Sequence, residues 1–178
     1  MKYLALSLII ILSVSSCKKG EEDPFLSVRS RKARLTNNWK LMQMNISSIE
    51  TNNFFGDDVT YTVIQNYGDN NLSIKMTHSS GSTLEENYEY SKTLQINKDG
   101  TYTTITSTQG DVETINDYWY WQNGNKKKDA LQLDKIYNIK ELRKDKLVLT
   151  WESSEETTYS AGGFSRTTLT GTMTFEPN

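Results

Sequence analysis

The chain contains few side chains that could perform chemistry. It has one histidine, His78, and one cysteine, Cys17, among its 178 residues. Because a structural zinc site takes about four Cys or His ligands and a catalytic one about three, we expect no metal centre. A Ser-His-Asp triad would have to use His78 as its base, and no serine lies in a G-x-S-x-G sequence. The sequence therefore predicts no catalytic residue of these kinds and no cofactor.

Paired carboxylates are the remaining source of catalysis, because glycoside hydrolysis needs two of them at a fixed separation. The candidates are Glu85, Glu89, Glu113, Glu152, Glu155 and Glu156. Glutamates on polar strand faces are mostly solvated charges. A hydrolase is therefore the least favoured hypothesis, and we expect a protein that is not an enzyme.

The run Tyr118-Trp119-Tyr120-Trp121 is the most distinctive local pattern. Successive side chains of a strand point to opposite faces, so the two tryptophans share one face and the two tyrosines the other. Two interpretations stay open: the tryptophans and Trp39 fill the interior, or they form a wall for an apolar ligand or a sugar ring. The candidate ligand-binding residues are Trp39, Tyr102, Trp119 and Trp121.

Composition favours one all-β domain. Ten Tyr, four Trp and abundant Thr and Ser suit a half-buried pleated surface, and 35% hydrophobic residues allow one modest core. The chain has 20 Lys and Arg against 22 Asp and Glu, a net charge of −2. Nucleic-acid binding normally needs a basic face, so we expect no nucleic-acid partner.

The N-terminal residues have the order of an export signal. Lys2 precedes an apolar run of about a dozen residues, which is too short for a membrane-spanning helix. The run ends at Val14-Ser15-Ser16-Cys17. These four residues resemble the lipobox of bacterial lipoproteins, in which a signal peptidase cuts before the cysteine. An ordinary secretory signal with an incidental thiol is the alternative.

The lipobox resemblance implies a lipid anchor. Residues 1–16 would be a signal peptide, Cys17 would carry the acyl chains, and residues 17–24 would be the lipidated cysteine and a charged tether. Each buried CH₂ contributes about 0.8 kcal/mol, so several chains hold a protein on a membrane durably. We expect a monomer in the cell envelope, anchored to the outer membrane at its periplasmic face or at the cell surface.

The rest of the chain reads as strands separated by turns. Residues 91–122 predict two or three consecutive antiparallel strands, with a tight turn at Gly100. A short helix is expected within residues 25–38, and an edge strand at residues 83–90. Two loops are expected, residues 49–58 around Phe54-Phe55 and residues 155–165 around Gly162-Gly163.

The order of strands and short motifs carries a second resemblance. The chain contains in turn LTNNWKL, LQINKDGTYT, YNIKELRKDKLVLTW and GTMTFEPN. This series resembles a bacterial lipocalin-like lipoprotein, although Asn37 stands where that family commonly has Gly, two residues before Trp39. The resemblance implies that residues 25–178 form one up-and-down antiparallel β-barrel of about eight to ten strands with a short N-terminal helix.

Two functions follow from that resemblance and from the aromatic residues. The first is binding of a small apolar or amphipathic ligand in the barrel mouth. The second is a protein- or glycan-interaction module with a filled barrel that presents its loops. An internal cavity would favour the first function, and a filled core the second.

Overall fold

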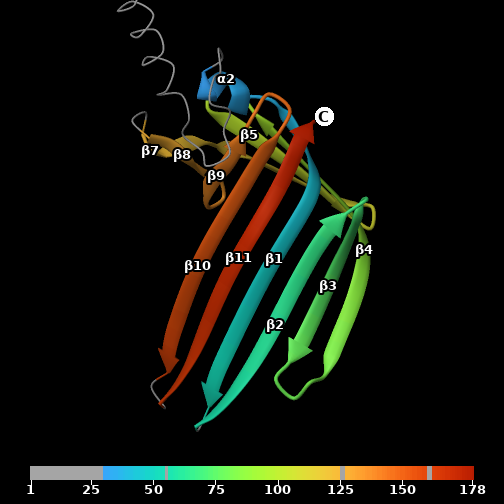
Figure 1. The fold of residues 1–178 in the computed structure, drawn as a ribbon, viewed down its shortest axis with the longest axis vertical. Helices are drawn as coiled ribbons and strands as arrows, with labels where there is room; N and C mark the ends of the chain where they lie inside the picture. The colour runs from blue at the N-terminus through green and yellow to red at the C-terminus, as the bar shows by residue number, and fades with distance from the viewer. Residues whose placement is uncertain (1–29, 55, 125–126, 160–161) are drawn as a thin grey trace, which may run out of the picture.

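The computed structural model describes residues 30–54, 56–124, 127–159 and 162–178. Within them the chain forms one short helix and a single sheet of eleven strands (Figure 1). The all-β class and the short helix are thereby confirmed. The signal peptide, Cys17 and the tether predicted for residues 1–24 lie outside the described residues.

The elements follow one another along the chain with short connections. They are α2 (Arg31–Leu35), β1 (Asn38–Phe54), β2 (Asp57–Gly68), β3 (Asn71–His78), β4 (Thr83–Ile96), β5 (Thr101–Thr108), β6 (Asp111–Tyr118), β7 (Tyr120–Asn123), β8 (Lys127–Gln132), β9 (Ile136–Leu142), β10 (Leu147–Tyr159) and β11 (Gly163–Pro177). The sheet order is β6-β5-β4-β3-β2-β1-β11-β10-β9-β8-β7, and every pairing is antiparallel.

The sheet closes on itself at one place only. The start of β1 pairs with the end of β4, with Trp39 opposite Leu94, so β1 to β4 form a small closed barrel. The other seven strands lie outside it, and β6 and β7 are the ends of the sheet. This arrangement replaces the expected single barrel of eight to ten strands. The early closure arises because β4 changes partners along its length: its first half pairs with β3, and its second half pairs with β5 and with the start of β1.

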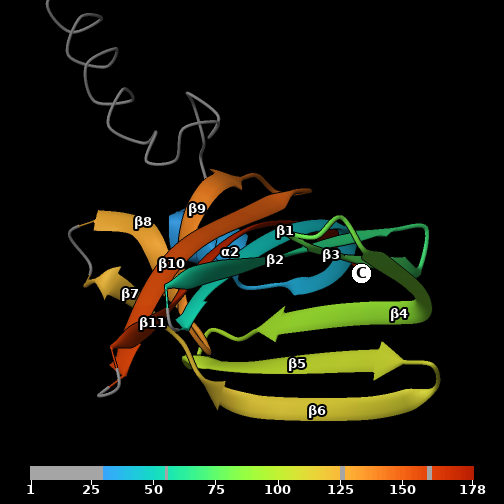
Figure 2. The same cartoon turned by 90° about the horizontal axis from the view of Figure 1, so that it is seen from below.

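The two halves of the sheet face each other across the core. Seen from below, β4, β5 and β6 form one layer, and β1, β2, β10 and β11 lie across from it (Figure 2). Leu35, Trp39 and Phe175 are fully buried. The Trp39 indole Nε1–H donates to the Leu35 carbonyl at 2.8 Å, which fixes the end of α2 over this core. All four barrel strands contribute buried side chains to this core, namely Trp39, Leu41, Met44, Tyr67, Leu72, Leu94 and Ile96.

Two expected loops are largely strand. β1 continues to Phe54 and β2 begins at Asp57, while β10 continues to Tyr159 and β11 begins at Gly163. Their polar Asn, Thr, Ser and Glu residues favoured a loop prediction, but continuous ladders to both neighbours satisfy the backbone of β1 and β11. The long ends of β1, β2, β10 and β11 lie side by side away from α2 (Figure 1).

The stretch predicted as an edge strand, residues 83–90, forms the first half of β4. Residues 83–89 pair with β3 on one side, whereas β5 pairs only with residues 90–96, so this half of β4 has a free edge as predicted. Its three glutamates are exposed. The tight turn predicted at Gly100 is present, with a φ of 98° that a side chain would resist.

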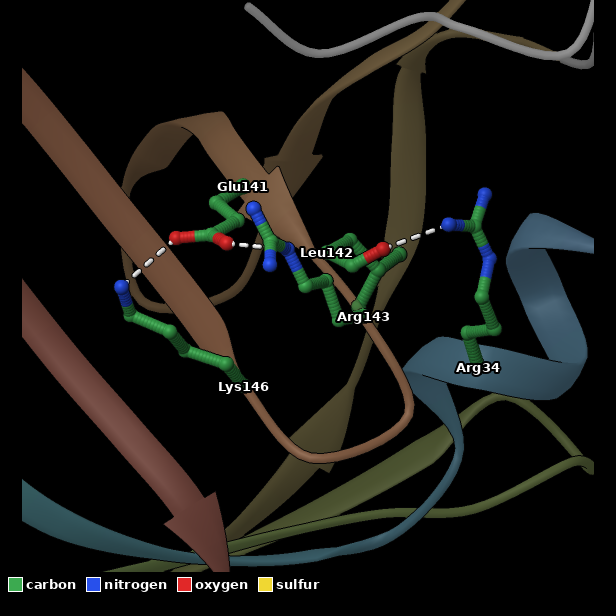
Figure 3. A network of polar contacts seen from close by, with 5 residues as sticks. All are labelled: Arg34, Glu141, Leu142, Arg143 and Lys146. Carbon is green, nitrogen blue, oxygen red and sulfur yellow. Dashed lines mark hydrogen bonds and ion pairs between the residues drawn. The ribbon is translucent and has the colours of Figure 1, made fainter. Parts of the chain in front are cut away.

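A buried carboxylate anchors the turn between β9 and β10 (Figure 3). Glu141 is 1% exposed, and its two oxygens meet Arg143 Nε at 2.5 Å and Lys146 Nζ at 2.8 Å. The neighbouring Leu142 carbonyl accepts a hydrogen bond from Arg34 of α2 at 2.5 Å. This network joins the helix to the far half of the sheet.

The network predicts an asymmetry between its two sides. Replacing both cations, Arg143→Met with Lys146→Met, leaves a buried carboxylate unpaired and should lower the free energy of unfolding by about 2 kcal/mol. Glu141→Gln leaves only half-exposed cations that water can solvate, so about 1 kcal/mol is expected. Urea unfolding measures both changes. A larger loss for Glu141→Gln than for the double variant would contradict this reading.

Candidate functional site

Aromatic and charged side chains gather at the end of the core furthest from α2. This group, the mouth cluster, comes from five parts of the chain: β2, β4, the β8–β9 turn, β9 and β10. Its members are Tyr67, Tyr90, Lys92, Asp134, Lys135, Tyr137 and Trp151. Strand alternation places Lys92 on the same face of β4 as the buried Leu94 and Ile96, which is why a lysine points inward here.

Rings surround the second lysine of the mouth cluster. Lys135 Nζ lies 4.1 Å from the centre of the Trp151 ring and 5.4 Å from that of Tyr137. The two rings meet edge to face with their centres 5.4 Å apart. The Tyr137 hydroxyl donates to Asp134 Oδ1 at 3.1 Å. Cation–π attraction holds the ammonium group against the indole face.

A second aromatic pair continues this wall towards β2. The rings of Tyr67 and Tyr90 lie 5.4 Å apart at 70°. The Tyr67 hydroxyl donates to Asn70 Oδ1 at 3.3 Å. The wall thus combines aromatic rings with the hydroxyls of Tyr67 and Tyr137, which already have acceptors.

The hydrogen-bond donors of the mouth cluster outnumber its acceptors. Neither Lys92 nor Lys135 forms an ion pair with any residue that the structure describes, although both are half-buried. The Trp151 indole N–H is also buried, and no described residue accepts a hydrogen bond from it. Unpaired buried donors and charges are costly, so such groups are candidates for a binding site.

Burial dominates the ionisation of the cluster. It lowers the pKa of Lys92, while the negative charges of Asp134 and Glu113 offset part of this effect. Burial likewise lowers the pKa of Lys135, with Asp134 opposing and Lys92 reinforcing the shift. The Tyr137 pKa is raised by burial and by Asp134. The site therefore holds two ammonium groups that are poorly solvated.

The unpaired lysine predicts a stability gain on its removal. The folded pKa of Lys92 lies below its ordinary value of 10.5. The cost of its charge is thus fully present below the folded pKa and disappears as the pH rises towards 10.5. Lys92→Met keeps most of the aliphatic stem and should raise the free energy of unfolding at neutral pH by about 1 kcal/mol.

Denaturant unfolding at neutral and at alkaline pH measures this gain. It should shrink as the pH rises, because wild-type Lys92 loses its proton there. Lys75→Met, at an exposed position of β3, serves as the matched control and should change stability little. A Lys92→Met protein less stable than wild type at neutral pH would contradict the prediction.

The predicted ligand-binding residues belong to the core. Trp39 and Tyr102 are 0% and 2% exposed, and Trp119 and Trp121 pack edge to face with centres 5.6 Å apart. The Trp119 indole N–H donates to the Asn97 carbonyl at 2.9 Å. Of the four, only Tyr102 adjoins the mouth cluster, since the charge of Asp134 acts on its hydroxyl.

The alternation predicted for the aromatic run is present. Tyr118 and Tyr120 are 70% and 57% exposed, whereas Trp119 and Trp121 are buried. The two tryptophans also border a shallow surface hollow of about 250 Å³ beside Lys32 of α2. The two tryptophans therefore belong to the core, with 6% and 7% of their surfaces exposed.

Most members of the mouth cluster were not singled out from the sequence. Lys92 carries a recognisable signal, because it occupies an inward position in the alternation that includes Leu94 and Ile96. Asp134 and Lys135 lie in a turn, and nothing in a turn sequence shows which ring it will meet. The contact of Lys135 with Trp151 depends on the pairing of β9 with β10.

His78, the only histidine, lies at the end of β3 in an exposed turn. Its Nδ1 lies 2.7 Å from Ser80 Oγ and accepts the Ser80 backbone N–H at 3.0 Å. Its ring also packs edge to face on Tyr61, with centres 4.9 Å apart. The contacts with Ser80 join residues two positions apart within one turn, whereas Tyr61 lies opposite His78 on β2.

Two absences and the comparisons complete the description. In the described ranges, no three His, Cys, Asp or Glu side chains come together in a way that could hold a metal ion. No helix within those ranges is both long and apolar enough to cross a membrane. No protein-family model, curated protein or solved structure matches the chain. The mouth cluster is therefore the basis for a proposed function.

Proposed function

We propose that the protein is a non-enzymatic lipoprotein of the cell envelope whose mouth cluster binds one small amphipathic anion. One observation carries this proposal: Lys92 and Lys135 are half-buried and form no ion pair with a described residue, beside an indole N–H without an acceptor. A carboxylate or phosphate group is the complement of these donors, because charge-assisted hydrogen bonds repay part of their desolvation.

The apolar part of the ligand would contact aromatic residues at the border of the core. Trp151 and Tyr137 are 5% and 3% exposed and Tyr90 is partly buried, so the ligand would meet the parts of these rings that the core leaves accessible beside Lys135. Such rigid rings bury apolar chains at low conformational cost. Because all four barrel strands contribute buried side chains to the core, the ligand would lie at the barrel mouth, as in the first of the two functions predicted from the sequence. A filled core was the expectation for the second function, the interaction module, so the proposal rests on the mouth cluster.

The anchor and the family remain part of the proposal. The sequence Val14-Ser15-Ser16-Cys17 supports acylation of Cys17 and attachment of a monomer to the outer membrane. The nearly sequential strand order supports a relationship to lipocalin-like lipoproteins for residues 25–178. In this variant of the barrel, closure falls after four strands. No nucleic acid is proposed as a partner, given the net charge of −2.

Two probes of equal chain length test the proposal. Octanoate and octanol share an alkyl chain and differ in the charged head. Tryptophan fluorescence of a Cys17→Ser protein, which cannot be acylated, should follow binding through Trp151. Octanoate should bind at least tenfold more tightly than octanol, roughly the contribution of one charged hydrogen bond. Equal affinity for the two probes, or no binding of octanoate, would contradict the proposal.

A further inference from the structure

The opposite face of the sheet carries an unassigned groove. This outer groove has a volume of about 510 Å³ and crosses β2, β1, β11, β10 and β9. Its lining is mostly neutral and polar. We infer that the outer groove binds a neutral oligosaccharide chain.

The lining side chains form a straight row across five strands. Asn66 pairs with Asn45, Asn45 with Thr172, Thr172 with Thr150, and Thr150 with Asn138. Paired residues of neighbouring strands point to the same face, so all five project into one groove. With strands about 4.8 Å apart, the row is about 19 Å long. A row of this length suits a chain of several sugar rings.

The groove offers hydrogen bonds that the protein itself does not use. None of the side chains of Asn45, Asn66 and Asn138 hydrogen-bonds to a residue in the described part of the chain. Each carboxamide both donates and accepts, as do the threonine hydroxyls beside it. Sugar hydroxyl groups have the same dual character. The row therefore complements a polyhydroxylated ligand without requiring charge on either side.

The charge of the lining narrows the ligand class further. Glu152 is the only charged residue among those that border the groove. A nucleic acid or a sulfated glycan would bring negative charge to this carboxylate and find no cation there. The next row contributes Ile64, Ser47 and Thr170, which add one aliphatic face and two hydroxyls. The row of asparagines and threonines and this second row are both suited to a neutral glycan.

This inference does not depend on the mouth cluster. Trp151 and Gly171 also border the groove, but the Trp151 ring lies over Gly171 on the inner face, and the strand neighbours Thr150 and Glu152 point to the outer face. The asparagines that carry this inference belong to the outer groove alone, so variants of Asn45 and Asn66 test it separately from variants of Lys92 and Lys135.

Calorimetric titration of the full-length protein in a detergent without a sugar head group tests the inference. The neutral probes are cellohexaose, maltohexaose and mannohexaose, and a sulfated hexasaccharide is the charged comparison. Asn45→Ala with Asn66→Ala should weaken binding of the neutral probe at least tenfold, roughly the loss of two net hydrogen bonds. Thr62→Ala with Thr168→Ala alters the same face outside the groove and should leave the affinity unchanged.

Thermal melting confirms that each variant is folded, and Asn138→Ala gives an independent loss at the other end of the row. Binding of a neutral hexasaccharide that the groove variants reduce and the control does not supports the inference. It is overturned if none of the neutral probes binds, if the control loses as much affinity as the groove variant, or if the sulfated probe binds more tightly than every neutral one.

Discussion

Lys92→Met combined with Lys135→Met is expected to weaken octanoate binding about a hundredfold while leaving the protein folded. Each lysine offers a charged hydrogen bond worth about 1.5 to 3 kcal/mol, and a tenfold change in affinity corresponds to about 1.4 kcal/mol. The double variant removes both donors but keeps the aliphatic stems against the rings. Octanol binding should change little, because it depends on the ring faces alone. Fluorescence titration measures both affinities.

The control for this prediction is a second pair of lysines. Lys75→Met with Lys98→Met removes the same charge from exposed positions and should leave octanoate binding within about twofold of wild type. The variant Lys92→Arg with Lys135→Arg keeps both positive charges, so it should bind octanoate more tightly than the double Met variant does. Comparable losses in both pairs would mean that octanoate responds to the overall charge and not to the mouth cluster.

The pH dependence of octanoate binding has a defined sign. Both lysines have folded pKa values below 10.5, so they lose their protons at lower pH than exposed lysines do. Octanoate is ionised at neutral pH and above, so its affinity should fall as the pH rises through the lysine pKa values. A bound anion raises these pKa values, which delays the fall at saturating octanoate. An affinity that stays constant into the alkaline range would contradict a role for the lysines.

Gly171→Val is expected to lower the free energy of unfolding by about 3 kcal/mol. The Trp151 ring lies directly over Gly171, and a Cβ built at this position overlaps three ring atoms. A side chain here must push the buried indole away, which opens the packing around Tyr137 and removes the surface against which Lys135 stacks. Overpacking of this kind is felt because protein interiors are close-packed. Urea unfolding measures the loss.

Two further variants separate this overlap from a general intolerance of glycine substitution. Gly68→Ala is the matched control, because a Cβ there meets no atom within 4 Å, and its cost should be small. Gly171→Ala and Trp151→Leu should be strongly non-additive, since the smaller side chain makes room for the new methyl group. Additive losses would show that the overlap with the ring is not the cause.

The sequence predicted the turn at Gly100, because Gly suits the positive φ value that this position adopts. The turn between β2 and β3 uses the same chemistry, since Asp69 and Asn70 also have positive φ values there. The class of fold followed from the recurrence of such turns between β-branched and aromatic segments.

The closure of the barrel could not be predicted in the same way. It depends on β4 bending so that Leu94 pairs with Trp39, which are 55 positions apart in the numbering of the chain. The length of β1 and β10 was also missed, because polar residues on both faces of a strand resemble a loop in sequence. Only the ladders that β1 makes with β2 and β11 show that these residues are extended.

The candidate site likewise has one feature that the sequence could predict locally and others that depend on contacts between distant residues. Strand alternation could place Lys92 inward beside Leu94, yet no local rule brings the Asp134–Lys135 turn to Trp151. Trp39, Trp119 and Trp121 are buried in the core, which agrees with the interpretation that these tryptophans fill the interior. A polar chain with few large aliphatic residues uses its tryptophans for volume, and the binding site that we propose consists instead of less conspicuous lysines and tyrosines.

Native mass spectrometry of the protein, released gently from its own envelope, tests the central claim most directly. The spectrum should show a stoichiometric extra mass that disappears on denaturation and belongs to an organic anion. The same preparation of the Lys92→Met, Lys135→Met variant should lack it, while the Lys75→Met, Lys98→Met control should retain it. A bare polypeptide mass for the wild type, or an identical bound mass in the mouth-cluster variant, would contradict the account.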